Sequence, residues 1–472
     1  MAIASIPPLR QGPGQASPQT AALPLPEQLA RLDLSRLRAY RENLDFYHGI
    51  QWLEPRRRER RLTFNYAKTI VEKTSSYVIS GHSLLVDPVA GSPEELERAR
   101  RAERALREAQ EANNLDQLDF DNEIDCSVLG DAAYKVTWGP REERVRVSAP
   151  DVQGLYAWWL ADDPGRVWRV ASRYTLSREE AEAFLAPLSD ATLPRGKRGS
   201  AEHTVVEVWT EAEFQLWLDG ALFQEQPNPY GFIPFVIYPN LREPKQFWGV
   251  SDLKAVKEPL RELNRAVSQL SMILELSGNP IAVLENVTDA QDIAVQPGAV
   301  WEVPEKARAY LLDLLQGGGV GLHVEYVNLI MRTLHDLAEV PRSAFGENRQ
   351  GLSGVALQME LDPLLKKVQR KRLIRSAALR RRNEMILRIL EQQTGQRFAP
   401  YRSRIVWGPV LPQDRSRLVE NETRLVAAGI HSRRTAAGLL DVADPDGEWE
   451  RWREEAQALR QAQGERSEGG ER

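Results

Sequence analysis

Cysteine is almost absent from this 472-residue sequence, in which Cys126 is the only one. A single cysteine excludes a disulfide within the chain and any metal site built from several thiolates. It fits a reducing compartment such as the cytoplasm. No run of about 18 apolar residues occurs, so we predict no transmembrane helix. The first residues also lack a basic start followed by a long apolar core, so we predict no signal peptide.

A basic excess is missing as well. The chain has 62 Lys and Arg residues against 67 Asp and Glu residues, for a net charge of −5. Proteins that hold nucleic acid tightly usually carry an excess of basic residues, because much of the affinity comes from neutralised phosphates. Any contact with DNA is therefore predicted to be local or weak.

The usual catalytic motifs are also missing. The sequence has no G-x-x-x-x-G-K-[ST] phosphate-binding loop, no H-E-x-x-H zinc motif and no G-x-S-x-G nucleophile turn, and its six histidines are scattered. The glycine run at 317–321 does not follow a strand in a βαβ unit, so it is interpreted as a flexible joint. These absences predict a protein that is not an enzyme and that has no cofactor or metal.

The sequence that is present indicates several packed units, because 472 residues are too many for one ordinary core. Its pattern predicts an α+β, multidomain, mainly helical protein. Residues 1–29 are rich in Pro, Gln, Gly and Ser and are expected to form a disordered arm, and the last residues have a similar composition.

The first half alternates between helical and β patterns. Apolar periodicity predicts helices over 32–48, 65–81 and 92–129, the last with a break near Asn113. Strands are expected at 133–138 and 144–148, followed by a β region over 203–238. Asp219-Gly220 lies between two apolar runs there and predicts a tight hairpin turn. The segment GFIPFVIYP is expected to add one more strand to that region.

A heptad pattern begins after Gly249. Apolar residues that step by three and four predict a helix over 251–277 with a seam formed by Leu253, Val256, Leu260, Leu263, Val267, Leu270 and Leu274. Ser251-Asp252 is a candidate cap, and Pro259 predicts either a bend or the true start of the helix. A second helix is expected over 320–340, with short β segments in between. The pair reads as a projecting helical hairpin, with a buried helix of a globular bundle as the alternative.

A long helix is predicted from Val355 to Thr394, with a bend near Pro363, and a glycine-spotted stretch precedes it. Its middle is strongly basic and includes Lys366, Lys367, Arg370, Lys371, Arg372 and Arg375. Such a helix would repel itself without acidic neighbours or phosphate nearby. The sequence leaves two interpretations open, namely pairing with acidic residues of a neighbouring subunit and contact with DNA or a capsid.

The order of these elements resembles the portal, or head-to-tail connector, proteins of tailed bacteriophages. YRENLDFYHGIQW and NYAKTIVEKTSSYVISG look like the opening helices of that family. LREPKQFWGVSDLKAVKEPLRELNRAVSQL looks like its passage into the first stem helix, and NRQGLSGVALQMELDPLLKKVQRKR like its tunnel loop and long bent helix. LVENETRLVAAGIHSRRTAAGLL looks like its C-terminal crown. The ordered set carries the resemblance, over roughly residues 34–455.

The resemblance implies a ring, usually of twelve identical subunits, at one vertex of the virion capsid, assembled in the host cytoplasm. It implies a wing at 30–250 and 356–412, stem helices at 251–277 and 320–340, a clip at 278–319, a tunnel loop at 341–355 and a crown at 413–472. The implied partners are the terminase motor, head-completion and tail adaptor proteins, capsid and scaffold proteins, and double-stranded DNA that passes through the channel during packaging and ejection. No membrane partner is expected.

The residues expected to line the channel lie in the tunnel loop: Asn348, Arg349, Gln350, Gly351, Leu352, Ser353, Gly354 and Val355. Glycines give this loop conformational freedom, and Leu352 and Val355 are apolar groups that could border the narrowest point without holding the DNA backbone. Two rival hypotheses remain at this point. One is a structural adaptor built on the helical hairpin, and the other is a DNA-processing enzyme, which the missing motifs disfavour.

Overall fold

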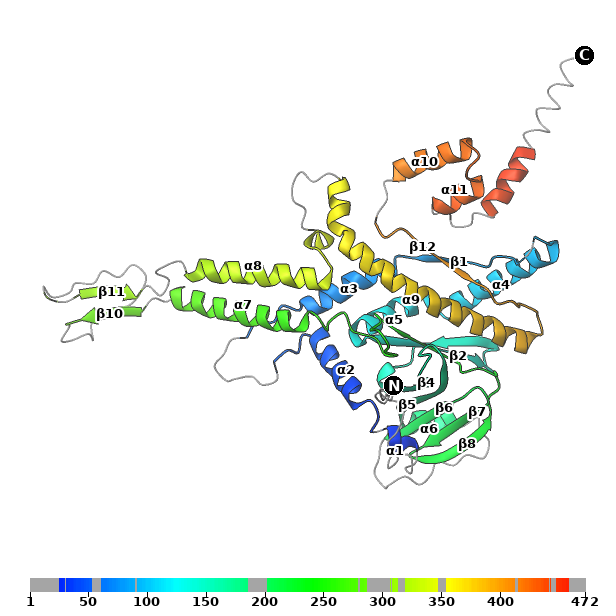
Figure 1. The fold of residues 1–472 in the computed structure, drawn as a ribbon, viewed down its shortest axis with the longest axis horizontal. Coiled ribbons are helices and arrows are strands. Elements are labelled where there is room, and N and C mark those ends of the chain that lie inside the picture. The colour runs from blue at the N-terminus through cyan, green and yellow to red at the C-terminus, as the bar shows by residue number, and fades with distance from the viewer. Residues whose placement is uncertain are drawn as a thin grey trace, which may run out of the picture. The chain divides into compact units, whose positions relative to one another are not determined.

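The computed structural model describes residues 25–29, 31–52, 61–89, 91–185, 202–278, 281–286, 306, 308–312, 319–346, 354–411, 415–440, 442 and 447–457. The chain divides into two compact units, Met1–Trp407 and Gly408–Arg472. Helices and strands alternate along the first unit, which bears out the expected mixed α+β class (Figure 1).

The helices of the first unit are α1 (Leu25–Leu29), α2 (Leu34–Tyr47), α3 (Tyr66–Val78), α4 (Pro93–Ala112), α5 (Leu115–Leu129), α6 (Arg178–Leu185), α7 (Lys257–Gly278), α8 (Gly319–Ala338) and α9 (Gly354–Thr394). Most of them lie where the sequence predicts them, whereas α1 and α6 were not predicted and α7 begins later than expected. Asn114 separates α4 from α5 with a left-handed φ of 48°, which is the predicted break. The disordered arm was expected to extend to residue 29, but Leu25–Leu29 are helical because Leu29 is buried against the strands of the largest sheet.

The largest sheet is antiparallel, with strand order β4-β5-β6-β7-β8. Its strands are β4 (Leu155–Trp159), β5 (Val167–Ser177), β6 (Glu202–Trp209), β7 (Glu213–Leu218) and β8 (Ala221–Pro227). Asp219 and Gly220 join β7 to β8 with φ values of 49° and 85°, which confirms the predicted hairpin turn. Its core includes Tyr156, Trp158, Val206 and Val208.

A second sheet has the order β3-β2-β9 and corrects one prediction. Its strands are β2 (Asp131–Gly139), β3 (Arg144–Ser148) and β9 (Phe235–Pro239). The segment GFIPFVIYP was expected to extend the preceding β region, but β9 pairs with β2, with Lys135 opposite Phe235. Alternating apolar residues predict a strand but not its neighbour, so the sequence could not identify this partner.

Two smaller sheets complete the first unit. Strand β1 (His82–Leu85) pairs with β12 (Arg404–Trp407), so segments that are more than 300 residues apart lie together. Strand β10 (Ile281–Glu285) pairs with β11 (Arg308–Leu312) beyond the ends of α7 and α8 (Figure 1). The long helix α9 packs against α3, α4, β2, β9 and β12. It therefore joins N-terminal helices of the unit to its second sheet and to its last strand.

The second unit is described by itself. It contains α10 (Arg415–Ala427), α11 (Arg433–Leu439) and a helix over 447–457. Ser432 caps α11 by accepting a hydrogen bond from the backbone amide of Thr435, and Gly429 ends the preceding helix region with a φ of 71°. The helical region is therefore interrupted between Gly429 and Ser432.

Candidate functional site

Helices α7 and α8 form an antiparallel hairpin whose two halves differ in burial. Near the base, the seam residues Leu253, Val256, Leu260 and Leu263 are buried. Farther along, Val267 and Leu270 are half-buried, and Leu274 is 51% exposed. The predicted seam therefore packs within its own chain only over its first half.

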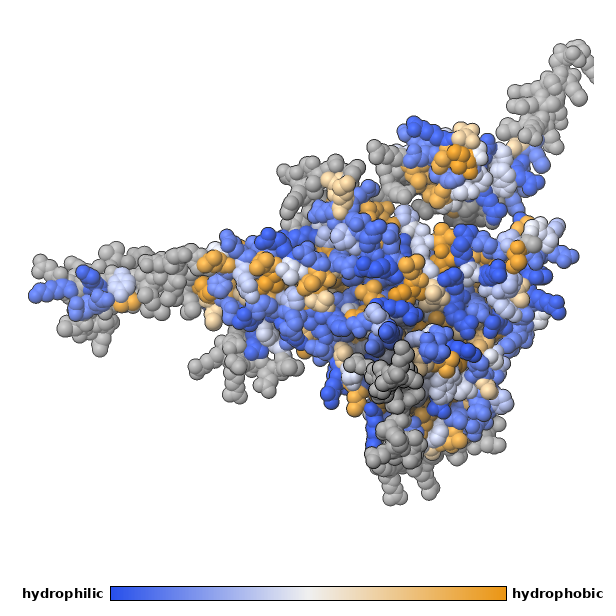
Figure 2. Space-filling view, in the orientation of Figure 1, coloured by the Kyte–Doolittle hydropathy of each residue, from blue (hydrophilic) through white to orange (hydrophobic). Residues whose placement is uncertain are grey.

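The exposed half of the hairpin is apolar. Side chains that a folded subunit would ordinarily bury are open to solvent on the outer half of both helices, namely Met272, Leu274, Leu322 and Val324, and others are exposed nearer the base, namely Tyr326, Leu329 and Leu337. Figure 2 shows apolar patches between polar ones along this part of the molecule. A run of exposed apolar side chains along a projecting element is typical of a protein contact surface.

The first turns of the predicted stem helix differ from expectation. Helix α7 begins at Lys257, so Pro259 lies in its first turn. Of the two alternatives for this proline, a bend or the true start of the helix, the start is therefore observed. Residues 252–256 form turns instead. Ser251 accepts a hydrogen bond from the backbone amide of Leu253, and its hydroxyl donates to the carbonyl oxygen of Val128 at 2.6 Å. The candidate cap thus fixes the segment that precedes α7 to the end of α5.

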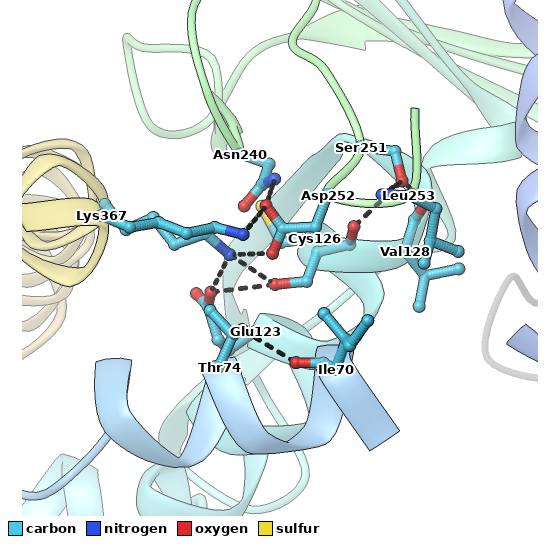
Figure 3. Close-up of polar contacts among 12 residues, drawn as sticks. Ile70, Thr74, Glu123, Cys126, Val128, Asn240, Ser251, Asp252, Leu253 and Lys367 are labelled. Carbon is cyan, nitrogen blue, oxygen red and sulfur yellow. Dashed lines mark hydrogen bonds and ion pairs between the residues drawn. The ribbon is translucent and has the colours of Figure 1, made fainter. Parts of the chain in front are cut away.

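Asp252 lies at the centre of a buried charge network beneath the hairpin. One of its oxygens is 2.6 Å from Nζ of Lys371, and the other is 3.4 Å from Nζ of Lys367 and 3.1 Å from Nδ2 of Asn240. The side chains of Asp252 and Lys371 are fully buried. Figure 3 shows Lys367 extending from α9 toward Asp252, with Asn240 above the two side chains in this view.

Glu123 of α5 is the second acidic centre of the network. Both of its oxygens accept hydrogen bonds from Arg375, at 2.6 and 3.0 Å, and Oε1 is 3.4 Å from Nζ of Lys371. Arg375 also donates to the carbonyl oxygens of Pro239 and Asn240. Three cations and two carboxylates are therefore buried together, each with several polar partners, as buried charges require.

The electrostatics follow from burial and from these pairings. Burial raises the pKa of Asp252, but the charges of Lys367 and Lys371 outweigh that effect and hold the pKa below its usual value. Burial lowers the pKa of Lys367, and Asp252 offsets this only in part. Burial also raises the pKa of the Cys126 thiol, which lies beside Arg375, so this cysteine is an unreactive core residue.

Both ends of the hairpin are fixed to the same two turns of α9. Asp252 precedes α7, and the carbonyl oxygen of Ala338 at the end of α8 accepts a hydrogen bond from Lys367 at 2.9 Å. The guanidinium of Arg370 donates to both carboxylate oxygens of Glu339, at 2.8 and 2.6 Å. The base of the hairpin is therefore held as a unit against the long helix.

A second polar junction lies on the other side of the hairpin base. Asp131 accepts a hydrogen bond from the hydroxyl of Tyr40 at 2.5 Å and one from the backbone amide of Gly249 at 2.7 Å. Burial raises the pKa of Asp131 to about 6. The guanidinium of Arg36 lies 3.9 Å from the ring centre of Trp248. The loop between β9 and α7 is thus attached to α2 and β2 as well.

The basic run on α9 differs from both interpretations drawn from the sequence, since these placed its partners outside the subunit. Lys367, Lys371, Arg372 and Arg375 are buried within their own chain, and Arg372 donates to the backbone carbonyls of Tyr77 and Val78. Lys366 is exposed and Arg370 pairs with Glu339 at the surface. The need for acidic neighbours was visible in the sequence, but Glu123 and Asp252 carried no signal that singled them out.

Most residues of the predicted tunnel loop, Asn348 to Ser353, lie outside the described residues. Gly354 and Val355 form the first turn of α9. Of the residues that the structure describes, none form a cluster of three or more metal-binding side chains. No helix among them is long and apolar enough to cross a membrane.

Comparison with protein families identifies the class. The sequence model for phage portal proteins of the SPP1 Gp6-like type matches residues 29–462. Because this match spans nearly the whole chain, the protein belongs to the phage portal protein family. This is a family of structural proteins, and membership implies a place at the capsid vertex of a virion. A search of curated proteins finds no match to the chain.

Proposed function

We propose that this chain is one subunit of a ring, usually of twelve subunits in this family, that forms the channel for double-stranded DNA at one capsid vertex. In this proposal DNA enters through the ring during packaging and leaves through it during ejection. The observation that carries the proposal is the hairpin of α7 and α8. It is firmly fixed at its base and apolar along its exposed half.

The hairpin is assigned to the stem, and the segment at its tip, 278–319, to the clip. An apolar surface that one subunit cannot bury is buried when identical subunits pack head to tail around an axis, since rotation closes such contacts into a ring. The remainder of the first unit, 30–250 and 356–412, is assigned to the wing. The packing of α9 against α3, β2 and β9 supports this, because it joins the two wing segments into one body.

The other assignments rest on the family resemblance. Residues 341–355 are proposed to form the tunnel loop that borders the DNA, and residues 413–472 to form the crown. The unit boundary at Trp407 lies close to the proposed start of the crown and supports it. The clip is proposed to bind the terminase motor during packaging and head-completion or tail adaptor proteins afterwards, and the wing to contact capsid and scaffold proteins.

The charge balance suits a channel of this kind. A chain with a net charge of −5 offers few free cations to the DNA backbone, and each additional fixed phosphate contact would slow sliding. The burial of Lys367, Lys371 and Arg375 removes three of the most prominent cations from any DNA-facing surface. These residues are proposed to stiffen the base of the stem.

The proposal is tested by the mass of the purified full-length protein. Mass photometry should find particles of about 0.6 MDa, as expected for twelve subunits of 53.4 kDa. The variant Leu274→Glu/Leu322→Glu places charge on the exposed apolar half of the hairpin and should shift the population to single subunits. The control Gln269→Glu/Asn328→Glu adds the same charge at exposed polar positions of the same helices and should keep the large particle. Single subunits from the unaltered protein at every concentration would overturn the proposal.

A further inference from the structure

A cleft of about 600 Å³ lies between the exposed side of α9 and the segment that leads into β12. Its charged lining consists of four arginines and two carboxylates: Arg380, Arg381, Arg402, Arg404, Asp87 and Glu384. The lining therefore carries a net charge of +2, whereas the whole chain carries −5. All six residues belong to the first unit, so the cleft is complete within one subunit.

Two of the four arginines are already neutralised. Arg404 donates two hydrogen bonds to the carboxylate of Asp87, at 2.8 and 3.0 Å, and these lower the pKa of Asp87. Arg381 donates to one oxygen of Glu384 at 2.9 Å, and the other oxygen of Glu384 pairs with Arg388 at 2.7 Å. The Arg404–Asp87 pair links two segments of the lining, and the two pairs of Glu384 lie within α9.

The other two arginines have no such partner. Arg380 donates its Nε proton to the backbone carbonyl of Ser376 at 3.2 Å. Among the residues that the structure describes, no carboxylate forms an ion pair with Arg380 or with Arg402. Both side chains are exposed, and they approach the cleft from different elements, one from α9 and one from the segment before β12. The cleft thus offers two guanidinium groups from different elements, neither of them paired with a carboxylate of the described residues.

Guanidinium groups without a carboxylate partner are well suited to phosphate. Their planar fork of N–H donors matches phosphate oxygens in a bidentate geometry, and the charge is retained at any physiological pH. A single carboxylate could be bound in the same way. A run of regularly spaced anions would occupy both arginines at once, as the backbone of a nucleic acid provides.

We propose that this cleft binds the phosphate backbone of double-stranded DNA, with Arg380 and Arg402 as its two contacts. The preference for DNA over another polyanion rests on the proposed function, which brings the subunit next to DNA. The binding itself requires neither the ring nor the stem hairpin. The contact is confined to one cleft with a net charge of +2, so it is compatible with a chain whose total charge is −5.

The test is fluorescence anisotropy of a labelled 20-base-pair duplex with the full-length protein, over a series of salt concentrations. Arg380→Gln/Arg402→Gln should weaken binding by about tenfold or more, since each lost contact is a charge-assisted hydrogen bond. The slope of log affinity against log salt should become shallower by about 2, at about 0.9 for each lost phosphate contact. The control Arg146→Gln/Arg178→Gln removes the same charge at two exposed arginines on other elements and should leave both quantities unchanged.

Equal losses in the two double variants would overturn the proposal, because the effect would then follow net charge alone. Binding of poly-glutamate in place of the duplex would also overturn it, in favour of an acidic protein partner. Particle mass measured on the same samples separates this result from the proposed function, since the cleft variants should assemble normally. A failure of DNA binding with intact rings would thus contradict the cleft and leave the ring standing.

Discussion

Replacing Asp252 with asparagine should destabilise the base of the hairpin strongly. Asp252 is fully buried and is shared by Lys371 at 2.6 Å and Lys367 at 3.4 Å. The Asp252→Asn change leaves two ammonium groups close together with only Glu123 to neutralise Lys371. Removal of one partner from a buried ion pair costs about 3–5 kcal/mol, because the remaining charge is buried without compensation.

The matched change at Lys371 should cost less. Lys371→Met leaves Lys367 and Arg375 facing Asp252 and Glu123, so the remaining charges balance and each carboxylate keeps a cation. We expect a loss of about 1–2 kcal/mol from the hydrogen bonds to Asp252 and Ser127. The double variant should cost at least about 1 kcal/mol less than the sum of the two single changes, since the sites are in direct contact.

Urea unfolding, followed by tryptophan fluorescence and by circular dichroism on the same samples, measures these differences. Agreement of the two probes establishes that one cooperative transition is observed, and all variants are compared at one protein concentration because the apparent stability of an oligomer depends on it. A smaller loss of stability for Asp252→Asn than for Lys371→Met would contradict this description of the charge network. So would additive effects of the two changes, because the network would then not act as one unit.

Three further predictions follow from other contacts. Burial raises the pKa of Asp131 from 3.8 to about 6. The protonated carboxyl therefore stabilises the fold by about 3 kcal/mol below about pH 4, and this contribution is lost as the pH rises through 6. Asp131→Asn should abolish this part of the pH dependence in unfolding curves, and an unchanged profile would refute the prediction. Gly249→Ala should destabilise the fold by several kcal/mol, because the added Cβ would lie 2.6 Å from Cβ of Pro239 and 2.9 Å from the amide nitrogen of Asn240. In the control Gly321→Ala, the added Cβ has nothing within 4 Å, so this change should be neutral or slightly stabilising. Equal melting temperatures of the two variants would contradict the prediction. Leu352→Gly/Val355→Gly should raise the ionic conductance of assembled rings in a bilayer if these residues border the narrowest point, and unchanged conductance would exclude that role.

Local signals in the sequence predicted most of the elements. Asp219-Gly220 specified a hairpin turn because few residues adopt positive φ at both positions. The seam predicted a helix with one buried face, and Leu260 and Leu263 are buried on α7, although Leu253 and Val256 are buried in the turns that precede it. In such cases the residues that specify the element lie next to one another in the chain.

Partners far apart in the sequence could not be predicted in the same way. Lys371 meets Asp252 across 119 residues and Glu123 across 248, and nothing near any of the three identifies the others. The basic run on α9 was therefore expected to contact something outside the subunit, although four of its residues are satisfied within it. The pairing of β9 with β2 was missed for the same reason. Strands β4 and β5 were not predicted at all.

The central claim, that this chain is a subunit of a DNA-conducting ring, is tested most directly by electron microscopy of the purified full-length protein in negative stain. The account predicts rings with a central hole in views along the axis, and the stem seen as a narrower extension in side views. Isolated subunits or solid rods over a range of protein concentrations would contradict it and would favour a structural adaptor built on the helical hairpin.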